Sequence, residues 1–118
     1  MEGRIGLAIT ALLTLVAIQF TAAASLPDAI LIPKVSRPED IRRARAALSA
    51  AQAPRELKLW AMIETPRGLL NAPAMAELGL HQRHGLAAFI AGTNDLAKAT
   101  GVRSADAMQP WLMHILLA

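Results

Sequence analysis

Three short polar segments of the sequence each follow an apolar run, and two of them contain a carboxylate. The segments are Pro33-Lys34-Val35-Ser36, Glu64-Thr65-Pro66-Arg67-Gly68 and Gly92-Thr93-Asn94-Asp95-Leu96. If the runs are parallel strands, these segments meet at the carboxyl end of one sheet, where α/β proteins place their ligands. Carboxylate oxygens with several waters are what Mg²⁺ prefers, so Glu64 and Asp95 can form a magnesium site there. Spacing leaves two simpler alternatives open, because Asp95 can cap the following helix and Glu64 can pair with Arg67.

Two basic residues belong to the same segments. The planar fork of Arg67 suits a substrate carboxylate or a phosphate, although an ion pair with Glu64 would occupy the same group. Lys34, at the end of an earlier run, either adds positive charge to the site or has only a structural role. The spacing of the remaining residues points to no Ser/His/Asp arrangement, so we assign no catalytic acid, base or nucleophile.

The elements that must position these residues follow from the apolar runs, which cover residues 29–35, 57–63 and 86–91. Ile32, Ile63 and Ile90 are 31 and 27 residues apart, which is the length of a strand, a crossover helix and a return strand. The runs are continuous rather than alternating, as in strands that are covered on both faces. The sequence therefore predicts an α/β fold with a parallel sheet and about three β-α units.

The intervening segments carry helix signals. Ser36 and Glu39 have the spacing of a capping box, with Pro38 in the first turn of the helix that they begin. A shorter helix is expected from Asn71 to Leu78, ending at Gly79. Further helices are expected over 96–100 and 105–118, with Pro110 near the start of the last one or kinking it.

Composition excludes several classes of protein. The chain has 118 residues, of which 54% are hydrophobic and 3% aromatic, and it contains no cysteine. Disulfide scaffolds, thiolate zinc sites and cysteine nucleophiles are thereby excluded. The formal net charge is +3, and aromatic side chains to stack on nucleobases are few, so we expect no nucleic-acid partner.

The N-terminal segment, residues 1–27, is expected to be a separate apolar helical unit ahead of a domain over 28–118. No charged residue occurs between Ile5 and Pro27. This length would permit a membrane span, and Ala22-Ala23-Ala24-Ser25 resembles a signal-peptidase site. Glu2 offsets Arg4 ahead of the run, which favours a core helix. A cytoplasmic protein without a membrane partner is the first expectation, and export or membrane attachment through residues 1–27 is the alternative.

Three stretches in order carry a family resemblance: LIPKVSRPEDIRRARAAL, LWAMIETPRGLLNAPAMA and FIAGTNDLAKATG. Together they make residues 26–118 resemble the HpcH/HpaI aldolase and citrate lyase β-subunit superfamily. Members are (β/α)₈ TIM barrels that use Mg²⁺ to cleave or form carbon–carbon bonds in 3-hydroxy acids or their CoA thioesters, such as citryl-, malyl- or citramalyl-CoA. The resemblance implies that Glu64 and Asp95 are the metal ligands and that the partner is a small acyl-CoA or oxo-acid substrate, which Arg67 and Lys34 would contact.

Two departures from the family pattern qualify this expectation. Ser36 stands where many relatives have a glutamate, so a carboxylate usual at that rim is replaced by a hydroxyl. A complete barrel needs about 250 residues, so we expect a partial barrel, completed by a homo-oligomer or a complementary fragment. The alternative function is a truncated, catalytically inactive fragment with an exported or membrane-attached N-terminus.

Overall fold

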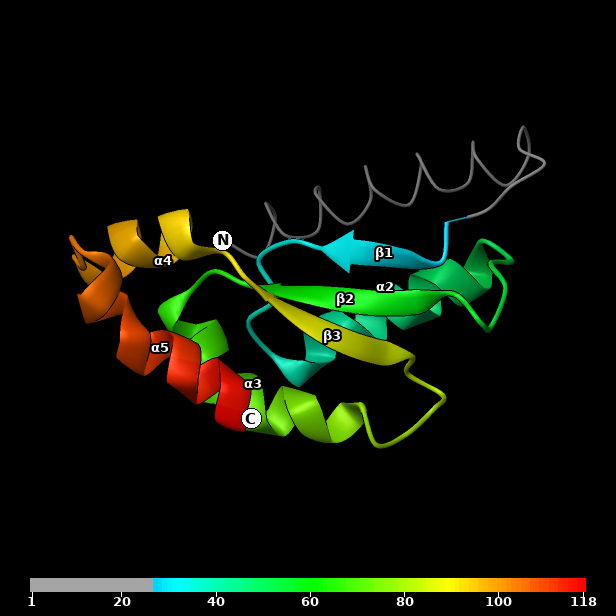
Figure 1. The fold of residues 1–118 in the computed structure, drawn as a ribbon. Coiled ribbons are helices and arrows are strands. Elements are labelled where there is room, and N and C mark those ends of the chain that lie inside the picture. Colours follow the sequence, from blue (N-terminus) through cyan, green and yellow to red (C-terminus); the bar gives the residue numbers. More distant parts are fainter. Residues whose placement is uncertain (1–26) are drawn as a thin grey trace.

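The computed structural model describes residues 27–118, and the expected helix of residues 1–27 falls almost wholly outside them. Three strands, β1 (Ala29–Ile32), β2 (Lys58–Ile63) and β3 (Leu86–Ala91), form one parallel sheet in the order β1-β2-β3 (Figure 1). Ile32 pairs with Ala61 and Ile63 pairs with Ala91, so the carboxyl ends of neighbouring strands lie side by side. The parallel α/β sheet expected from the sequence is confirmed.

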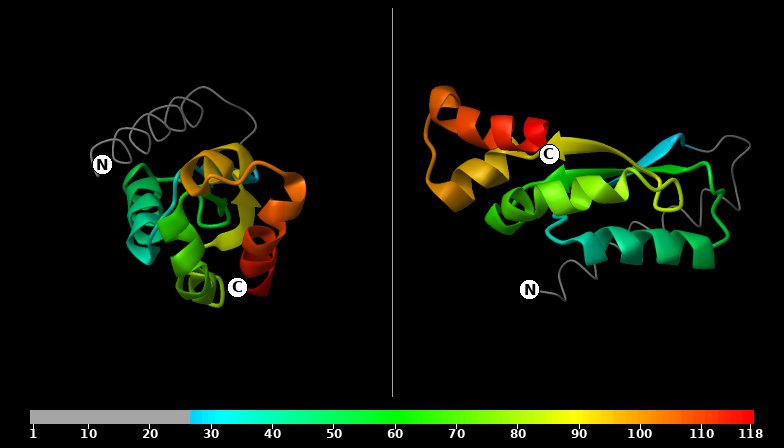
Figure 2. Two further views of the ribbon diagram at one scale, coloured as in Figure 1. Left: turned by 90° about the vertical axis from the view of Figure 1, so that its left-hand side faces the viewer. Right: turned by 90° about the horizontal axis from the view of Figure 1, so that it is seen from below.

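Four helices accompany the sheet in the described residues. The helices α2 (Pro38–Ala50), α3 (Pro66–Leu78) and α5 (Ala105–Leu117) lie on one face, whereas α4 (Thr93–Thr100) lies beyond the end of β3 (Figure 2). Sequential strand order with crossover helices on a single face is consistent with a fragment of a β/α barrel rather than with a doubly wound sheet. None of the helices in this region has the length and apolar character that crossing a membrane requires.

The core lies between the sheet and this helical face. Alternate strand residues point into it, namely Ile30, Ile32, Leu59, Ala61 and Ile63. Ile41 and Leu48 of α2 and Met75 of α3 pack against them, because residues three, four and seven apart share one face of a helix. The opposite face of the sheet carries Leu31 and Trp60, which remain 37% and 42% exposed.

Several element boundaries differ from those expected. Strand β1 ends at Ile32 instead of Val35, since Pro33 lacks an amide donor and Lys34 turns the chain with a φ of 53°. The start expected at Asn71 is wrong: α3 begins at Pro66, with Thr65 as its N-cap. Similarly, α4 begins at Thr93 rather than at Leu96.

The expected capping box of α2 is also wrong. The N-cap is Arg37, and the acidic partner is Asp40 in place of Glu39. Asp40 is 1% exposed, and its Oδ2 accepts hydrogen bonds from the amides of Ser36 (2.9 Å) and Arg37 (3.1 Å). Glu39 points to solvent and pairs with Arg42. A buried carboxylate therefore holds the segment that joins β1 to α2.

Replacing this carboxylate should destabilise the fold. Asp40→Ala leaves two amides without their acceptor, so we expect the free energy of unfolding to fall by about 1–3 kcal/mol. Urea unfolding followed by circular dichroism measures the change. Glu39→Ala is the control and should cost less than about 1 kcal/mol, since it removes only an exposed ion pair. Equal losses in the two variants would contradict the assignment of the capping carboxylate to Asp40.

Candidate functional site

The rim of the sheet is organised by the turn after β1. Lys34 has a left-handed backbone (φ 53°), and its amide donates to Oε2 of Glu64 at 2.7 Å. The amide of the next residue, Val35, donates to the carbonyl of Met62 at 3.2 Å, which keeps the turn attached to β2. A left-handed backbone is strained for a lysine, and these two hydrogen bonds stabilise it.

Glu64 is positioned by the abrupt change from strand to helix. It directly follows β2, and Thr65 then caps α3 by accepting the Gly68 amide on Oγ1 at 2.9 Å. The same hydroxyl lies 2.8 Å from Oγ of Ser36. A Cβ on Gly68 would come within 2.8 Å of the Val35 carbonyl oxygen, so only glycine permits this close approach of the two loops. The backbone on both sides of Glu64 is therefore fixed.

Asp95 reaches the rim from the first turn of α4, where a carboxylate is favoured by the helix dipole. The next residue, Leu96, is fully buried and anchors the helix start. Gly92 accepts the Leu96 amide at 3.0 Å and donates its own amide to Ile63 at 2.9 Å. A Cβ on Gly92 would lie 2.5 Å from Cγ of Glu64, so this glycine makes room for the glutamate.

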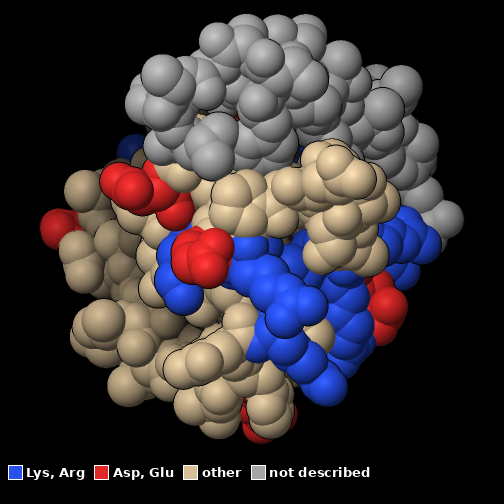
Figure 3. All heavy atoms as spheres, turned by 90° about the vertical axis from the view of Figure 1, so that its right-hand side faces the viewer, with Lys and Arg blue, Asp and Glu red and all other residues tan. Residues whose placement is uncertain are grey.

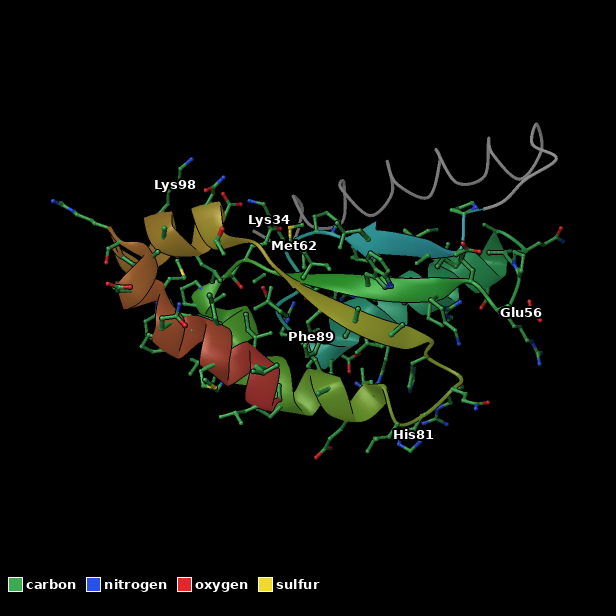
Figure 4. All side chains as sticks on the ribbon, viewed as in Figure 1. Lys34, Glu56, Met62, His81, Phe89 and Lys98 are labelled. Carbon is green, nitrogen blue, oxygen red and sulfur yellow. The ribbon has the colours of Figure 1, made fainter. Side chains whose placement is uncertain are left out.

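Glu64 and Asp95 interact electrostatically. Burial raises the pKa of Glu64, and a hydrogen bond and charge repulsion from Asp95 raise it further, while the Lys34 amide and ammonium act in the opposite direction. Nζ of Lys34 lies 3.9 Å from Oδ2 of Asp95. Figure 4 shows Lys34 near Met62, at the end of the sheet beside α4. The structure thus brings Lys34, Glu64 and Asp95 together at one rim.

The simpler alternatives for these acids can be compared with the geometry. Arg67 is exposed in the first turn of α3, and within residues 27–118 no ion pair joins it to Glu64. Asp95 is not the cap of its helix, because the N-cap is Gly92 and no side chain provides a capping bond there. Neither alternative therefore accounts for the position of the two carboxylates.

The donor set is chemically suited to a magnesium ion. The charge of Asp95 contributes to the raised pKa of Glu64, a cation bound between the two carboxylates would offset this repulsion, and hard oxygen donors suit Mg²⁺. In the described part of the chain, no group of three or more His, Cys, Asp or Glu residues is placed so that it could hold a metal ion. The residues fit an ion held by two carboxylates and completed by water and substrate, as magnesium sites commonly are.

Sequence reasoning missed the residues that hold the carboxylates. Gly92, Ser36 and Thr65 set the space and the backbone around Glu64, but only the Thr65-Pro66 pair carries a recognisable signal, that of a helix N-cap followed by proline. The contact of Gly92 with Glu64 joins positions 28 residues apart, so no local pattern reveals it.

Comparison with known proteins identifies the family. The family model HpcH/HpaI aldolase/citrate lyase matches residues 10–112, and the chain belongs to this family. The match begins inside the apolar N-terminal segment. Two curated relatives, each named (3S)-malyl-CoA thioesterase, come from Cereibacter sphaeroides strains ATCC 17023 and KD131. Each is 48% identical over 94 residues, which is 77% of this chain and 29% of the relative. The chain thus spans less than a third of the length of these relatives.

The pKa of Glu64 should fall when Asp95 loses its charge. Asp95→Asn removes both contributions of Asp95 that raise this pKa, so Glu64 should titrate at a lower pH, as measured by carboxyl-carbon NMR. Asp106→Asn, in the first turn of α5, is the matched control and should leave Glu64 unchanged. A Glu64 pKa that does not move in Asp95→Asn would show that the two carboxylates are not coupled.

Proposed function

We propose that this chain supplies the magnesium-binding rim of a carbon–carbon lyase that acts on a 3-hydroxyacyl-CoA, such as malyl-, citryl- or citramalyl-CoA, or on a related hydroxy-oxo-acid. The observation that carries the proposal is the convergence of Glu64 and Asp95 from adjacent strand ends. Family membership supports an enzyme of the CoA-ester lyase type. The (β/α)₈ barrel belongs to the proposal, with β1 to β3 as three of its strands.

Glu64 and Asp95 hold the ion in this proposal and leave open positions for substrate. When bound, Mg²⁺ supplies Lewis-acid stabilisation of negative charge on the substrate oxygens. The Lys34 ammonium, 3.9 Å from Asp95, adds positive charge beside those oxygens. Arg67 is exposed at the start of α3, where its planar fork can bind a substrate carboxylate or a CoA phosphate.

In the proposed reaction, negative charge develops on the substrate oxygens, beside the cationic side chains of Lys34 and Arg67. Cleavage breaks the carbon–carbon bond next to the hydroxyl-bearing carbon, and the electron pair passes to the acyl fragment as an enolate. The hydroxyl proton passes to water as this oxygen becomes the carbonyl of the second product, and the enolate takes up a proton from water to give the acyl thioester. Lys34 and Arg67 bind and orient the anionic groups, and neither carboxylate acts as a base. The reverse direction is a condensation that uses the same contacts.

Thioester hydrolysis is a second candidate, favoured by the name of the relatives, (3S)-malyl-CoA thioesterase. In that reaction water adds to the thioester carbonyl, the bond to sulfur breaks, and the proton released by water passes to the CoA thiolate.

A third candidate is a catalytically silent fragment that keeps the metal site. In each case the domain over 28–118 binds the ion.

Magnesium titration tests the site itself. Calorimetry at pH 8 should show saturable binding by the wild type, weakened at least about tenfold in Glu64→Gln and in Asp95→Asn, because each variant removes a charged ligand. Glu77→Gln, at the far end of α3, is the control and should bind as the wild type does. Affinity should fall as the pH drops through the raised pKa of Glu64, since the ion requires the ionised carboxylate. No saturable binding by the wild type would remove the proposal.

The role of Gly92 can be tested without removing a ligand. Gly92→Ala places a methyl group against Glu64, so we expect magnesium affinity to fall about tenfold although both carboxylates remain. Gly79→Ala, at the C-terminus of α3, controls for the general effect of replacing glycine. Wild-type affinity in Gly92→Ala would mean that the rim adapts without loss.

A turnover assay separates the candidate reactions. Malyl-CoA is incubated with the full chain and Mg²⁺, and the products are separated by chromatography. Acetyl-CoA with glyoxylate identifies cleavage, and malate with free CoA identifies hydrolysis. Binding of Mg²⁺ without either product supports the silent fragment.

Arg67→Lys should raise KM more than it lowers kcat if Arg67 binds the substrate.

A further inference from the structure

The end of the sheet opposite the carboxylate rim carries a second concave site. A cavity of about 600 Å³ lies between the C-terminal half of α2, the loop that leads into β2, and the loop that precedes β3. Four cationic residues line it, namely Arg45, Arg55, Lys58 and Arg83, and Glu56 is the only acid among its lining residues. Figure 3 shows Lys and Arg side chains gathered on this face. The lining carries a formal charge of +3, which equals the net charge of the whole chain.

Arg45 is built into the fold rather than free on the surface. Its Nε donates to the carbonyl of His84 at 2.9 Å, and its Nη2 donates to the carbonyl of Leu57 at 2.6 Å. Gly85, with a φ of 67°, makes room for the guanidinium, since a Cβ there would lie 2.2 Å from Nη2. These bonds use two of the five N–H groups of the arginine and hold its planar guanidinium in place, so the remaining N–H groups can donate to a ligand.

Arg83 is positioned in a similar way. Its Nε donates to Nε2 of the buried His84 at 3.2 Å, which leaves the terminal nitrogens of its fork for another partner. Burial and the nearby arginines lower the pKa of His84, and the neutral ring is the form that accepts this bond. Arg55 and Lys58 are exposed, and no ion pair to a described residue neutralises either of them.

We propose that this pocket, defined by Arg45, Arg55, Lys58 and Arg83, binds a small molecule that carries two adjacent phosphoryl groups. A diphosphate has about three negative charges at neutral pH, which matches the charge of the pocket. Arginine forks bind phosphate oxygens in pairs, and two positioned forks favour a ligand with several such oxygens. The volume lies in the range of small-molecule sites. No aromatic side chain lines the pocket, so stacking with bases, on which single-stranded nucleic acids depend, has no partner there.

The pocket is separate from the carboxylate rim. Lys58 begins β2 and Glu64 follows its end, so the two positions are roughly 20 Å apart along an extended strand. Figure 4 shows Glu56 and Lys34 at opposite ends of the sheet. A ligand in the pocket would therefore not contact Glu64 or Asp95.

Calorimetry with the full chain tests the proposal. Inorganic diphosphate is titrated in magnesium-free buffer containing EDTA, which prevents an ion at the rim from binding the probe. We expect saturable binding that is weakened at least about tenfold in the Arg55→Gln/Arg83→Gln variant. The matched control, Arg43→Gln/Arg103→Gln, removes two exposed arginines outside the pocket and should bind as the wild type does. Circular dichroism confirms that both variants are folded, and Arg45 is left intact because it supports the backbone.

Other probes identify the source of the ligand and the limits of the proposal. ADP that binds more tightly than diphosphate and competes with it identifies a nucleoside diphosphate, whereas equal affinity identifies the free diphosphate group. The proposal is overturned by absent saturable binding, or by equal weakening in the control variant, which would indicate general charge attraction. It is also overturned if Arg67→Gln abolishes binding, or if a single-stranded RNA oligonucleotide binds the pocket more tightly than diphosphate.

Discussion

The hydrogen bond from the Lys34 amide to Glu64 is the contact on which the rest of the site depends. It joins the turn after β1 to the end of β2, and it requires the left-handed backbone of Lys34. The strain of that backbone is offset because the bond partner is a carboxylate, and hydrogen bonds to charged groups are stronger than neutral ones. The same contact directs the Glu64 side chain towards Asp95, so local strain and the carboxylate pair are parts of one arrangement.

Close packing of backbone around Glu64 makes this arrangement rigid. Gly68 lets the start of α3 approach the Val35 carbonyl, and Gly92 lets the chain after β3 pass beside the Glu64 side chain. Both glycines act through the space that a Cβ would fill and not through chain flexibility. Burial raises the pKa of Glu64 and the neighbouring Asp95 raises it further, so keeping Glu64 ionised beside Asp95 is unfavourable. A fold that maintains such a pair is suited to binding a cation.

The two ends of the sheet differ in the charged residues that they carry. Glu64 and Asp95 follow the strands, whereas Arg45, Arg55, Lys58 and Arg83 gather where the strands begin. Parallel strands produce this separation directly, because every strand starts at one end and finishes at the other. The formal net charge of +3 is therefore unevenly distributed, with two carboxylates beside Lys34 at one end of the sheet and four cationic residues at the other.

The apolar runs and their spacing determined the parallel sheet and placed Glu64 and Asp95 after neighbouring strands, because strand periodicity and crossover length are local properties. The three stretches quoted from the sequence carried the family resemblance, and the family model that matches residues 10–112 confirms it. The bonds of Asp40 to the start of α2 and the start of α3 at Pro66 are local features, which the sequence analysis placed at the wrong residues. Tertiary structure alone decided the turn at Lys34 and the contact between Gly92 and Glu64. It also decided that the Arg45 side chain donates hydrogen bonds to two carbonyls that are distant in the sequence, those of His84 and Leu57. Each of these depends on residues that packing brings together across several elements, and no short-range pattern in the sequence records such a distance.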